Sequence, residues 1–254
     1  MTTPASIFRS LHTSAQPLIL FNAWDAGSAA AIADSGASAI ATSSWAVAEA
    51  SGYRDGEELP FERLVDCTRR IVASVSLPVS VDAETGYGKT DEAVAANVLT
   101  LVRAGAAGIN LEDRNPSGSG LASLHEAAGR IAAIRHAVKQ NGRDVFINAR
   151  CDVFFMDSAD ITTSGTGKLA EAVKRAQAYL AAGADGIFLP GLSDLSLVEQ
   201  AARAIAAPLN VMVRSPDAIA PLRQAGARRI SFGPAPFIAA MNGLRSAARS
   251  AFDA

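Results

Sequence analysis

Acidic side chains gather just after two apolar segments in the middle of the chain. Asp82 and Glu84 follow Pro78–Val81, and Glu112 follows Gly108–Leu111. Asp82 and Glu84 are two residues apart, so an extended backbone points both carboxylates the same way. Crowded carboxylates repel each other unless a cation or protons intervene. Ligand sets made only of oxygen favour Mg²⁺ or Mn²⁺ over zinc. These three acids therefore predict a divalent metal site rather than helix caps, the usual role of acids after strands.

A third apolar segment adds an arginine to this group. Arg150 follows Val145–Ala149 and is itself followed by Asp152, while Asp113 is next to Glu112. For Asp113 and Asp152 two interpretations stay open: ligation of the metal, or capping a helix and orienting Arg150. Either way, four or five carboxylates and one arginine are expected at one place.

Histidine is absent from this group. His12 precedes the first apolar segment, and His125 and His136 lie within a predicted helix. A zinc site or a catalytic triad built on histidine is therefore not expected. Acid–base chemistry would fall to carboxylates, serine, tyrosine or a metal-bound water. The segment 83–90, AETGYGKT, lacks one glycine of the phosphate-loop pattern and carries Glu84, which would repel phosphate, so a nucleotide site is not expected either.

The elements that must position these residues alternate regularly. Four times a helical segment ends in Gly-Ala and a short apolar strand follows; glycine readily forms the left-handed turn that stops a helix. Eight predicted strands are Pro17–Phe21, Ser38–Ala41, Pro78–Val81, Gly108–Leu111, Val145–Ala149, Gly186–Leu189, Pro208–Val213 and Arg229–Phe232. Eight predicted helices cover roughly 25–35, 58–75, 91–104, 121–140, 167–182, 194–206, 216–225 and 235–251.

Eight strands alternating with eight helices predict a single-domain (β/α)₈ TIM-type barrel over residues 1–254. The alternative is an open, doubly wound sheet, which would need a reversal of strand order. In a barrel the carboxyl ends of all strands meet at one mouth, where active sites lie. The acids and Arg150 would then share that mouth.

Composition excludes several classes of function. The net charge of −2 gives no reason to expect nucleic acid or an anionic membrane as a partner. No apolar run is long enough to cross a bilayer. Two cysteines cannot form a disulfide framework, so we expect a reducing, cytoplasmic setting. Residues 1–24 faintly resemble a transit peptide, but one arginine is too few, and a short helix or loop under the barrel is favoured.

Several short motifs occur in an order that resembles the isocitrate lyase / phosphoenolpyruvate mutase superfamily over nearly the whole chain. They are Asn22–Gly27 (NAWDAG), Ser43–Ala48 (SSWAVA), Gly52–Glu57 (GYRDGE), Val81–Gly88 (VDAETGYG), Gly108–Asp113 (GINLED), Ile147–Asp152 (INARCD) and Ala184–Pro190 (ADGIFLP). A single one of these motifs would be weak evidence for the family, but their occurrence in this order makes the resemblance specific.

The resemblance implies roles for particular residues. Asp82 would be the direct ligand of Mg²⁺, or of Mn²⁺, and Asp55, Glu84 and Glu112 would hold metal-bound waters. Arg150 would bind a substrate carboxylate or enolate oxygen. The family acts on pyruvate-like groups through an enolate, so Arg150, Glu112 and Asp55 would form the catalytic set. The residues expected to bind the carboxylate and body of an α-oxo or dicarboxylic acid are Trp24, Ser43, Ser44, Trp45, Arg150 and Asn210.

The chain also departs from the family pattern. Glu84 stands where aspartate is common, and Cys151 where threonine is usual. Lyases for isocitrate or methylisocitrate carry a K-[KR]-C-G-H motif after the fourth strand, whereas Arg114–Ser123 reads RNPSGSGLAS. These two activities are therefore not expected. The glycine and serine content of this loop suits a lid over the site, with Asn115, Ser117 and Ser119 facing the substrate.

Three functional hypotheses follow. The first is a Mg²⁺-dependent lyase that cleaves a C–C bond of an α-oxo or α-hydroxy acid. The second is a phosphonomutase or a P–C hydrolase. The third is an α-oxo-acid-binding protein without catalysis. By resemblance we expect a homodimer or homotetramer in which the C-terminal helix, about 235–252 with Leu244, packs on or swaps with a neighbouring subunit. The alternative is an eighth barrel helix packed on its own chain.

Overall fold

Nine parallel strands form one sheet that curls into a nearly closed barrel. The structure is a computed structural model that describes residues 3–115, 120–155 and 165–253. The strands pair in the order β1-β9-β8-β7-β6-β5-β4-β3-β2, which confirms the predicted TIM-type barrel. Their bounds are β1 Leu18–Leu20, β2 Asn22–Ala23, β3 Ile40–Thr42, β4 Val79–Asp82, β5 Gly108–Glu112, β6 Phe146–Arg150, β7 Gly186–Phe188, β8 Leu209–Met212 and β9 Arg229–Ser231.

The sheet has one strand more than predicted, because the predicted strand Pro17–Phe21 is observed as β1 and a second, short strand, β2, follows directly after Phe21. β1 pairs with β9 and β2 pairs with β3, and Phe21 lies between them. The Asn22 side chain connects β3 with the segment that follows β9. Its Nδ2 donates to the Thr42 carbonyl at 2.8 Å, and its Oδ1 accepts from the Phe232 and Gly233 amides at 3.0 and 2.9 Å. These bonds replace main-chain pairing at the break and join the two ends of the sheet.

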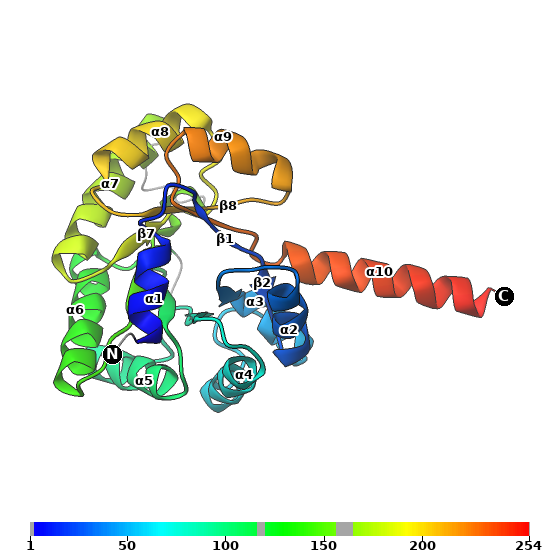
Figure 1. The fold of residues 1–254 in the computed structure, drawn as a ribbon. Coiled ribbons are helices and arrows are strands. Elements are labelled where there is room, and N and C mark those ends of the chain that lie inside the picture. Colours follow the sequence, from blue (N-terminus) through cyan, green and yellow to red (C-terminus); the bar gives the residue numbers. More distant parts are fainter. Residues whose placement is uncertain (1–2, 116–119, 156–164, 254) are drawn as a thin grey trace.

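Helices surround the barrel (Figure 1). The other predicted helices lie around the sheet, whereas the last one, α10 (Ala235–Phe252), projects away from it (Figure 1). The short α3, whose backbone begins next to the carboxyl end of β3, was not predicted. The helices are α1 Pro4–Leu11, α2 Ala26–Asp34, α3 Ser44–Ala50, α4 Phe61–Ser74, α5 Asp91–Arg103, α6 Leu124–Gln140, α7 Gly165–Ala181, α8 Leu195–Ala204, α9 Ile219–Gln224 and α10 Ala235–Phe252, with 3₁₀ turns at Asp152–Phe154 and Pro216–Ala218. No helix in the described part of the chain is both long and apolar enough to span a bilayer.

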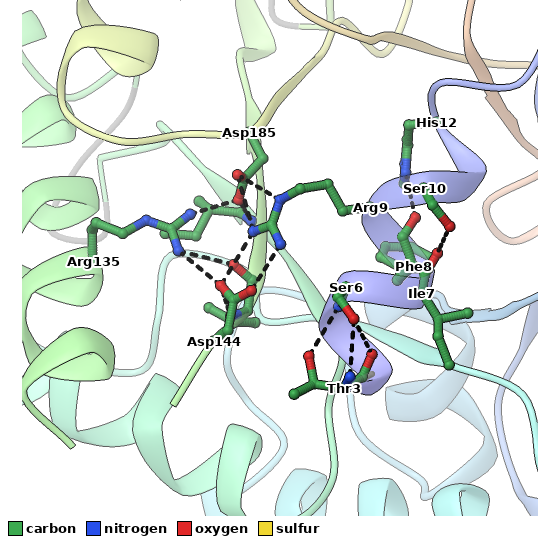
Figure 2. A network of polar contacts seen from close by, with 12 residues as sticks. Thr3, Ser6, Ile7, Phe8, Arg9, Ser10, His12, Arg135, Asp144 and Asp185 are labelled. Atoms are coloured by element: carbon green, nitrogen blue, oxygen red, sulfur yellow. Dashed lines mark hydrogen bonds and ion pairs between the residues drawn. The ribbon is translucent and has the colours of Figure 1, made fainter. Parts of the chain in front are cut away.

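The helix α1 covers the amino-terminal end of the barrel, as favoured for this segment. Phe8 is fully buried and meets the Phe146 ring edge-on at a centroid distance of 5.5 Å. Arg9 reaches Asp144 at 2.7 Å and Asp185 at 3.2 Å, just before β6 and β7 (Figure 2). The aromatic contact and the ion pairs together hold α1 against the strand ends opposite the candidate site.

His12 at the end of α1 should make the protein less stable in mild acid. Its Nδ1–H donates to the Phe8 carbonyl at 2.8 Å, its ring stacks on Phe146, and its Nε2 has no partner among the described residues. Burial, with the nearby Arg229 charge, lowers its pKa from 6.5 to about 3. The unfolded chain therefore binds the proton first, so stability is complete above pH 6.5 and is lost as the pH falls towards 3.

The expected loss from His12 is about 2 kcal/mol of unfolding free energy between pH 7 and pH 5. Urea denaturation of the native protein and of His12→Phe at both pH values measures it, because the other titrating groups are common to both. We expect the pH dependence to be smaller in His12→Phe by this amount. Equal pH dependence in the two proteins would show that His12 is not buried as a neutral ring.

The last helix, α10, leaves the barrel soon after it begins. Pro236 is buried, and the Phe237 ring lies edge-on against Trp24 and Trp45 at 5.2 and 5.9 Å. The helix then projects away from the ring of other helices (Figure 1), with Leu244 62% and Phe252 86% exposed. This exposure contradicts the alternative of an eighth helix packed along its own barrel.

Candidate active site

A cavity of about 1060 Å³ opens at the carboxyl ends of the strands. Its polar end is lined by predicted site residues from four different segments of the chain. These are Ser43, Ser44, Trp45, Asp55, Asp82 and Arg150. The barrel therefore brings together residues that are more than a hundred positions apart, as predicted for its mouth.

Strand alternation explains which side chains face inward. Asp82 pairs in register with Asn110, and Glu112 with Arg150. Residues two apart on a strand share a face, so Asn110 and Glu112 both point into the barrel. Buried polar side chains thus occupy inward positions in otherwise apolar strands, with Asp82 and Arg150 nearest the cavity.

Asp82 ends β4 with an unpartnered oxygen. Its Oδ2 accepts a long hydrogen bond of 3.3 Å from the Ser44 amide, and its Oδ1 is buried with no hydrogen-bond partner in the part of the chain that the structure describes. Burial raises the pKa of Asp82 above its usual range, against the effect of the Arg150 charge. A buried carboxylate oxygen that lacks a donor is an expected feature of a cation ligand.

The donor set fits Mg²⁺ with one protein ligand and several waters. Asp55 shares the cavity with Asp82 and is exposed to solvent. Among the described residues, no three Asp, Glu, His or Cys side chains are placed to form a complete protein cage. Mg²⁺ commonly retains most of its water and needs one or two carboxylates, so the residues present fit Mg²⁺ with Asp82 as its direct ligand, which stays a prediction.

Glu84 and Glu57 hold two loops together beside Asp55. Glu84 accepts from the Gly56 and Glu57 amides at 2.8 and 2.7 Å and from the Tyr87 hydroxyl at 2.6 Å. In return, Glu57 accepts from the Thr85 amide and hydroxyl and from the Tyr87 amide. We call this reciprocal pair the loop clasp. Glu84 therefore positions the Asp55 loop, and it does not line the cavity.

The loop clasp contains unusual backbone conformations. Glu57, Glu84 and Tyr87 have φ values of 63°, 49° and 56°. Such left-handed conformations are uncommon outside glycine, and they cluster at functional sites. At Gly86, with φ of 103°, a Cβ would lie 2.5 Å from Val94 Cγ1, so only glycine fits. Gly86 thus allows a tight loop beside the site.

Arg150 is held by acids on both sides. Its Nη1 lies 2.8 Å from Glu112, and its Nε lies 2.6 Å from Asp152, which also pairs with Arg114 at 2.7 Å. Burial raises the pKa of Glu112, an effect that Arg150 opposes. Asp152 therefore orients Arg150. Of the two interpretations of Asp152, the contacts favour orientation of Arg150 over ligation of a metal.

Asp113 and Cys151 belong to the supporting structure. Asp113 accepts from the Asp152 amide at 2.9 Å, from Arg175 at 3.2 Å and from the Tyr179 hydroxyl at 2.7 Å. Cys151 is fully buried, and burial raises its pKa well above the usual value, so it is not a reactive thiolate.

Some predicted residues lie elsewhere. Trp24 lines a different groove beside α2. Asn210 is fully buried below the cavity, where its amide bonds to Asn148 and Ser231. Neither lines the cavity, which corrects their predicted contact with substrate. Of the predicted lid residues, Asn115 donates its backbone amide to the Gly120 carbonyl at 3.0 Å. Ser117 and Ser119 lie outside the described residues.

Asn22 and Asn110 are among the lining residues that were missed. Asn110 Oδ1 accepts from Asn148 at 2.9 Å and from the buried Arg229 at 3.0 Å. Burial lowers the pKa of Arg229 to about 9. The signal for Asn110 was available: it lies two positions before Glu112, on the same face of a strand that is otherwise apolar.

Comparison with known proteins agrees with this geometry. A family model described as phosphoenolpyruvate phosphomutase matches residues 8–252. The crystal structure of a candidate phosphonomutase from Burkholderia cenocepacia J2315 is 46% identical, with a TM-score of 0.92 and 98% of each chain covered. An uncharacterized protein of Mycobacterium tuberculosis is 35% identical over 97% of this chain and 89% of its own. The 2-methylisocitrate lyase of Escherichia coli is 30% identical over 82% of this chain and 69% of its own.

Proposed function

Because the chain belongs to the phosphoenolpyruvate phosphomutase family, within the isocitrate lyase / phosphoenolpyruvate mutase superfamily, we propose that it is a Mg²⁺-dependent lyase. The reaction is cleavage of a C–C bond in an α-oxo or α-hydroxy carboxylic acid through a pyruvate-type enolate. The observation that carries the proposal is the unpartnered Asp82 Oδ1 in the same cavity as Arg150. Relatives include both lyases and phosphonomutases.

The polar end of the cavity supplies the parts that this chemistry needs. Mg²⁺ held by Asp82, with the exposed Asp55 beside its waters, would supply a Lewis acid where negative charge develops. Glu84 would act by holding the Asp55 loop, and Glu112 by holding Arg150. The segment Ser43–Trp45 binds the substrate carboxylate, and Arg150 stabilises charge on the enolate oxygen. Glu112 and Asp152 fix the guanidinium beforehand, so little reorganisation is needed during the reaction.

A substrate panel tests the proposed reaction. Oxaloacetate, substituted malates, methylisocitrate and phosphonopyruvate are each offered with Mg²⁺. Pyruvate release is followed for all of them, and formation of phosphoenolpyruvate is also followed for phosphonopyruvate. We expect pyruvate to be released from one of the panel compounds other than phosphonopyruvate. We also expect EDTA to abolish this release. Turnover of phosphonopyruvate alone would favour the second hypothesis, that the protein is a phosphonomutase. The similarity to the candidate phosphonomutase from Burkholderia cenocepacia is the reason for keeping this hypothesis. Oxalate binding without turnover of any compound would indicate a binding protein.

We also propose that α10 packs on a neighbouring subunit in a homo-oligomer. A groove of about 880 Å³ lies between β1, α2 and the start of α10, lined by apolar residues that include Leu18, Ile32 and Ala240. It would accept a helix such as the exposed end of α10 from a second copy. Packing the exposed end of α10 into such a groove would remove apolar surface of both copies from water, which favours association.

Leu244→Glu should weaken this assembly. Leu244 is 62% exposed, so a charge there costs little in the isolated chain but would be buried at an interface. We expect light scattering coupled to size exclusion to give a smaller assembly at micromolar concentration, with an affinity lower by roughly tenfold or more. Arg245→Glu, on the same helix, controls for charge. An unchanged mass for Leu244→Glu would contradict the role of this helix.

A further inference from the structure

A buried arginine lies inside the barrel, below the residues that line the cavity. Arg229 begins β9 and is 1% exposed. Its Nη2 donates to Asn110 Oδ1 at 3.0 Å and lies 3.5 Å from Ser80 Oγ, and its guanidinium carbon lies 5.7 Å from the centroid of the Phe8 ring. Within the described chain it forms no salt bridge, and its Nε and Nη1 have no hydrogen-bond partner. Arg229 is therefore a buried cation without a counterion.

An unpaired cation at this position does not favour folding. Burial lowers the pKa of Arg229 to about 9, and the charge of Asp82 opposes this effect. A charge that leaves water without gaining an opposite charge destabilises the folded state, and an apolar side chain of similar volume would fill the same space without this penalty. Departures of this kind from the rules of a stable core are expected at functional sites. Arg229 therefore points to a role in the site above it.

Arg229 fixes the orientation of the Asn110 amide. Arginine carries only donors, so the Asn110 atom that faces it must be the oxygen. Asn148 Nδ2 donates to the same oxygen at 2.9 Å, and it also donates to Asn210 Oδ1 at 3.1 Å. If the Asn110 amide were flipped, its NH₂ group would face the donors of both neighbours. The amide is therefore held in one orientation.

The nitrogen of the same amide remains available to a ligand. In the part of the chain that the structure describes, Asn110 Nδ2 donates to no other residue, and it is not a fully enclosed atom. Asn110 is the register partner of Asp82, and both side chains line the cavity. With its oxygen turned towards Arg229 and Asn148, Asn110 offers a donor to the cavity beside Asp82.

We propose that Asn110 Nδ2 donates a hydrogen bond to an oxygen of the bound α-oxo acid, and that Arg229 is a positioning residue that holds Asn110 in this orientation. The guanidinium also polarises the amide, which strengthens its donor. A donor that is fixed before binding stabilises negative charge on an oxygen without reorganisation during the reaction. The inference rests on the proposed function, because the ligand is taken to be an α-oxo acid.

Asn110→Asp replaces the donor by a charged acceptor of the same shape. The new carboxylate should pair with Arg229, so we expect the thermal midpoint of the metal-free protein to stay at or above the native value. Calorimetric titration with oxalate at saturating Mg²⁺ should nevertheless give a Kd at least about tenfold higher. If Asn110→Asp does not fold, Asn110→Ala removes the same donor and should also raise Kd about tenfold. Native oxalate affinity in the folded variant would overturn the inference.

A double-mutant cycle tests whether Arg229 acts through Asn110. Arg229→Met removes an unpaired buried charge, so the thermal midpoint should not fall. The Asn110 amide loses its fixed orientation, however, and the Kd of oxalate should rise by about fivefold. In the Asn110→Ala background the same substitution should change Kd by less than about twofold. An equal loss in both backgrounds would show that Arg229 acts only through its charge, and would overturn its positioning role.

A second buried arginine provides the matched control. Arg130 on α6 is 9% exposed, and its Nη1 is buried with no partner among the described residues. It does not line the cavity, so Arg130→Met should keep the Kd of oxalate within about twofold of the native value.

The native titration separates the inference from the proposed function. If the native protein binds oxalate with Mg²⁺ and the Asn110 variants bind it equally well, the inference is wrong and the proposed function stands. If the native protein does not bind oxalate, the proposed function is wrong, and the inference is wrong with it.

Discussion

Asp82→Asn is expected to abolish Mg²⁺-dependent oxalate binding, with a loss of affinity of at least about a hundredfold. Changes to groups that only support a metal ligand already cost roughly 10–100-fold, and a direct ligand should cost more. The substitution keeps the shape of the side chain but replaces one carboxylate oxygen by an amide and removes the negative charge. Neither change suits a hard cation that prefers charged oxygen.

The fold should survive Asp82→Asn. Burial disfavours the charged form of Asp82, so the neutral amide is not expected to lower the thermal midpoint of the metal-free protein. Asp66→Asn, at a half-exposed site on α4 that pairs with Arg70, is the matched control and should bind oxalate normally. Oxalate binding by Asp82→Asn at native affinity would show that Asp82 is not the metal ligand.

Arg150→Lys should lower kcat/KM by about a hundredfold to a thousandfold, the loss seen when one donor to a developing oxyanion is removed. Lysine keeps the positive charge but cannot contact Glu112, Asp152 and a substrate oxygen in one plane, as the guanidinium can. The measurement is steady-state turnover of whichever panel compound releases pyruvate, together with oxalate affinity.

Two comparisons make the Arg150 result specific. Arg203→Lys changes an exposed pair with Glu199 and should leave kcat/KM within about twofold, because surface pairs contribute little. Arg150→Met removes the buried charge and leaves Glu112 and Asp152 unpaired, so it should also destabilise the fold by about 3–5 kcal/mol. Native kcat/KM in Arg150→Lys would mean that any cation suffices and that Arg150 has no directed role.

The barrel could be predicted because its signals are local and repeated. Gly36, Gly105, Gly183 and Gly226 each have positive φ and end a helix before an apolar strand, and this pattern is visible in the sequence. The break at Phe21 could not be predicted, because it depends on where the two ends of the sheet meet. The departure of α10 from the barrel also has no local signal, since its start is an ordinary helix with prolines in the first turn.

The candidate site, like the fold, could be predicted from the sequence only in part. Asp82 and Arg150 were identified by their positions after strands, and they line the cavity. The role of Glu84 in the loop clasp was not predicted, because its partners at Gly56 and Glu57 lie on another loop. The apolar residues that line the cavity, such as Leu192, Met212 and Leu222, were also missed, since they appear in the sequence as ordinary core residues.

The most direct measurement is titration of the native protein with oxalate, once with Mg²⁺ and once with EDTA. Asp82 and Arg150 in one cavity predict binding that needs the metal: a clear heat signal with Mg²⁺, none with EDTA, and loss of the signal in both Asp82→Asn and Arg150→Met. Equal binding with and without Mg²⁺, or no binding under either condition, would contradict the assignment of this cavity as a Mg²⁺-dependent site for α-oxo acids.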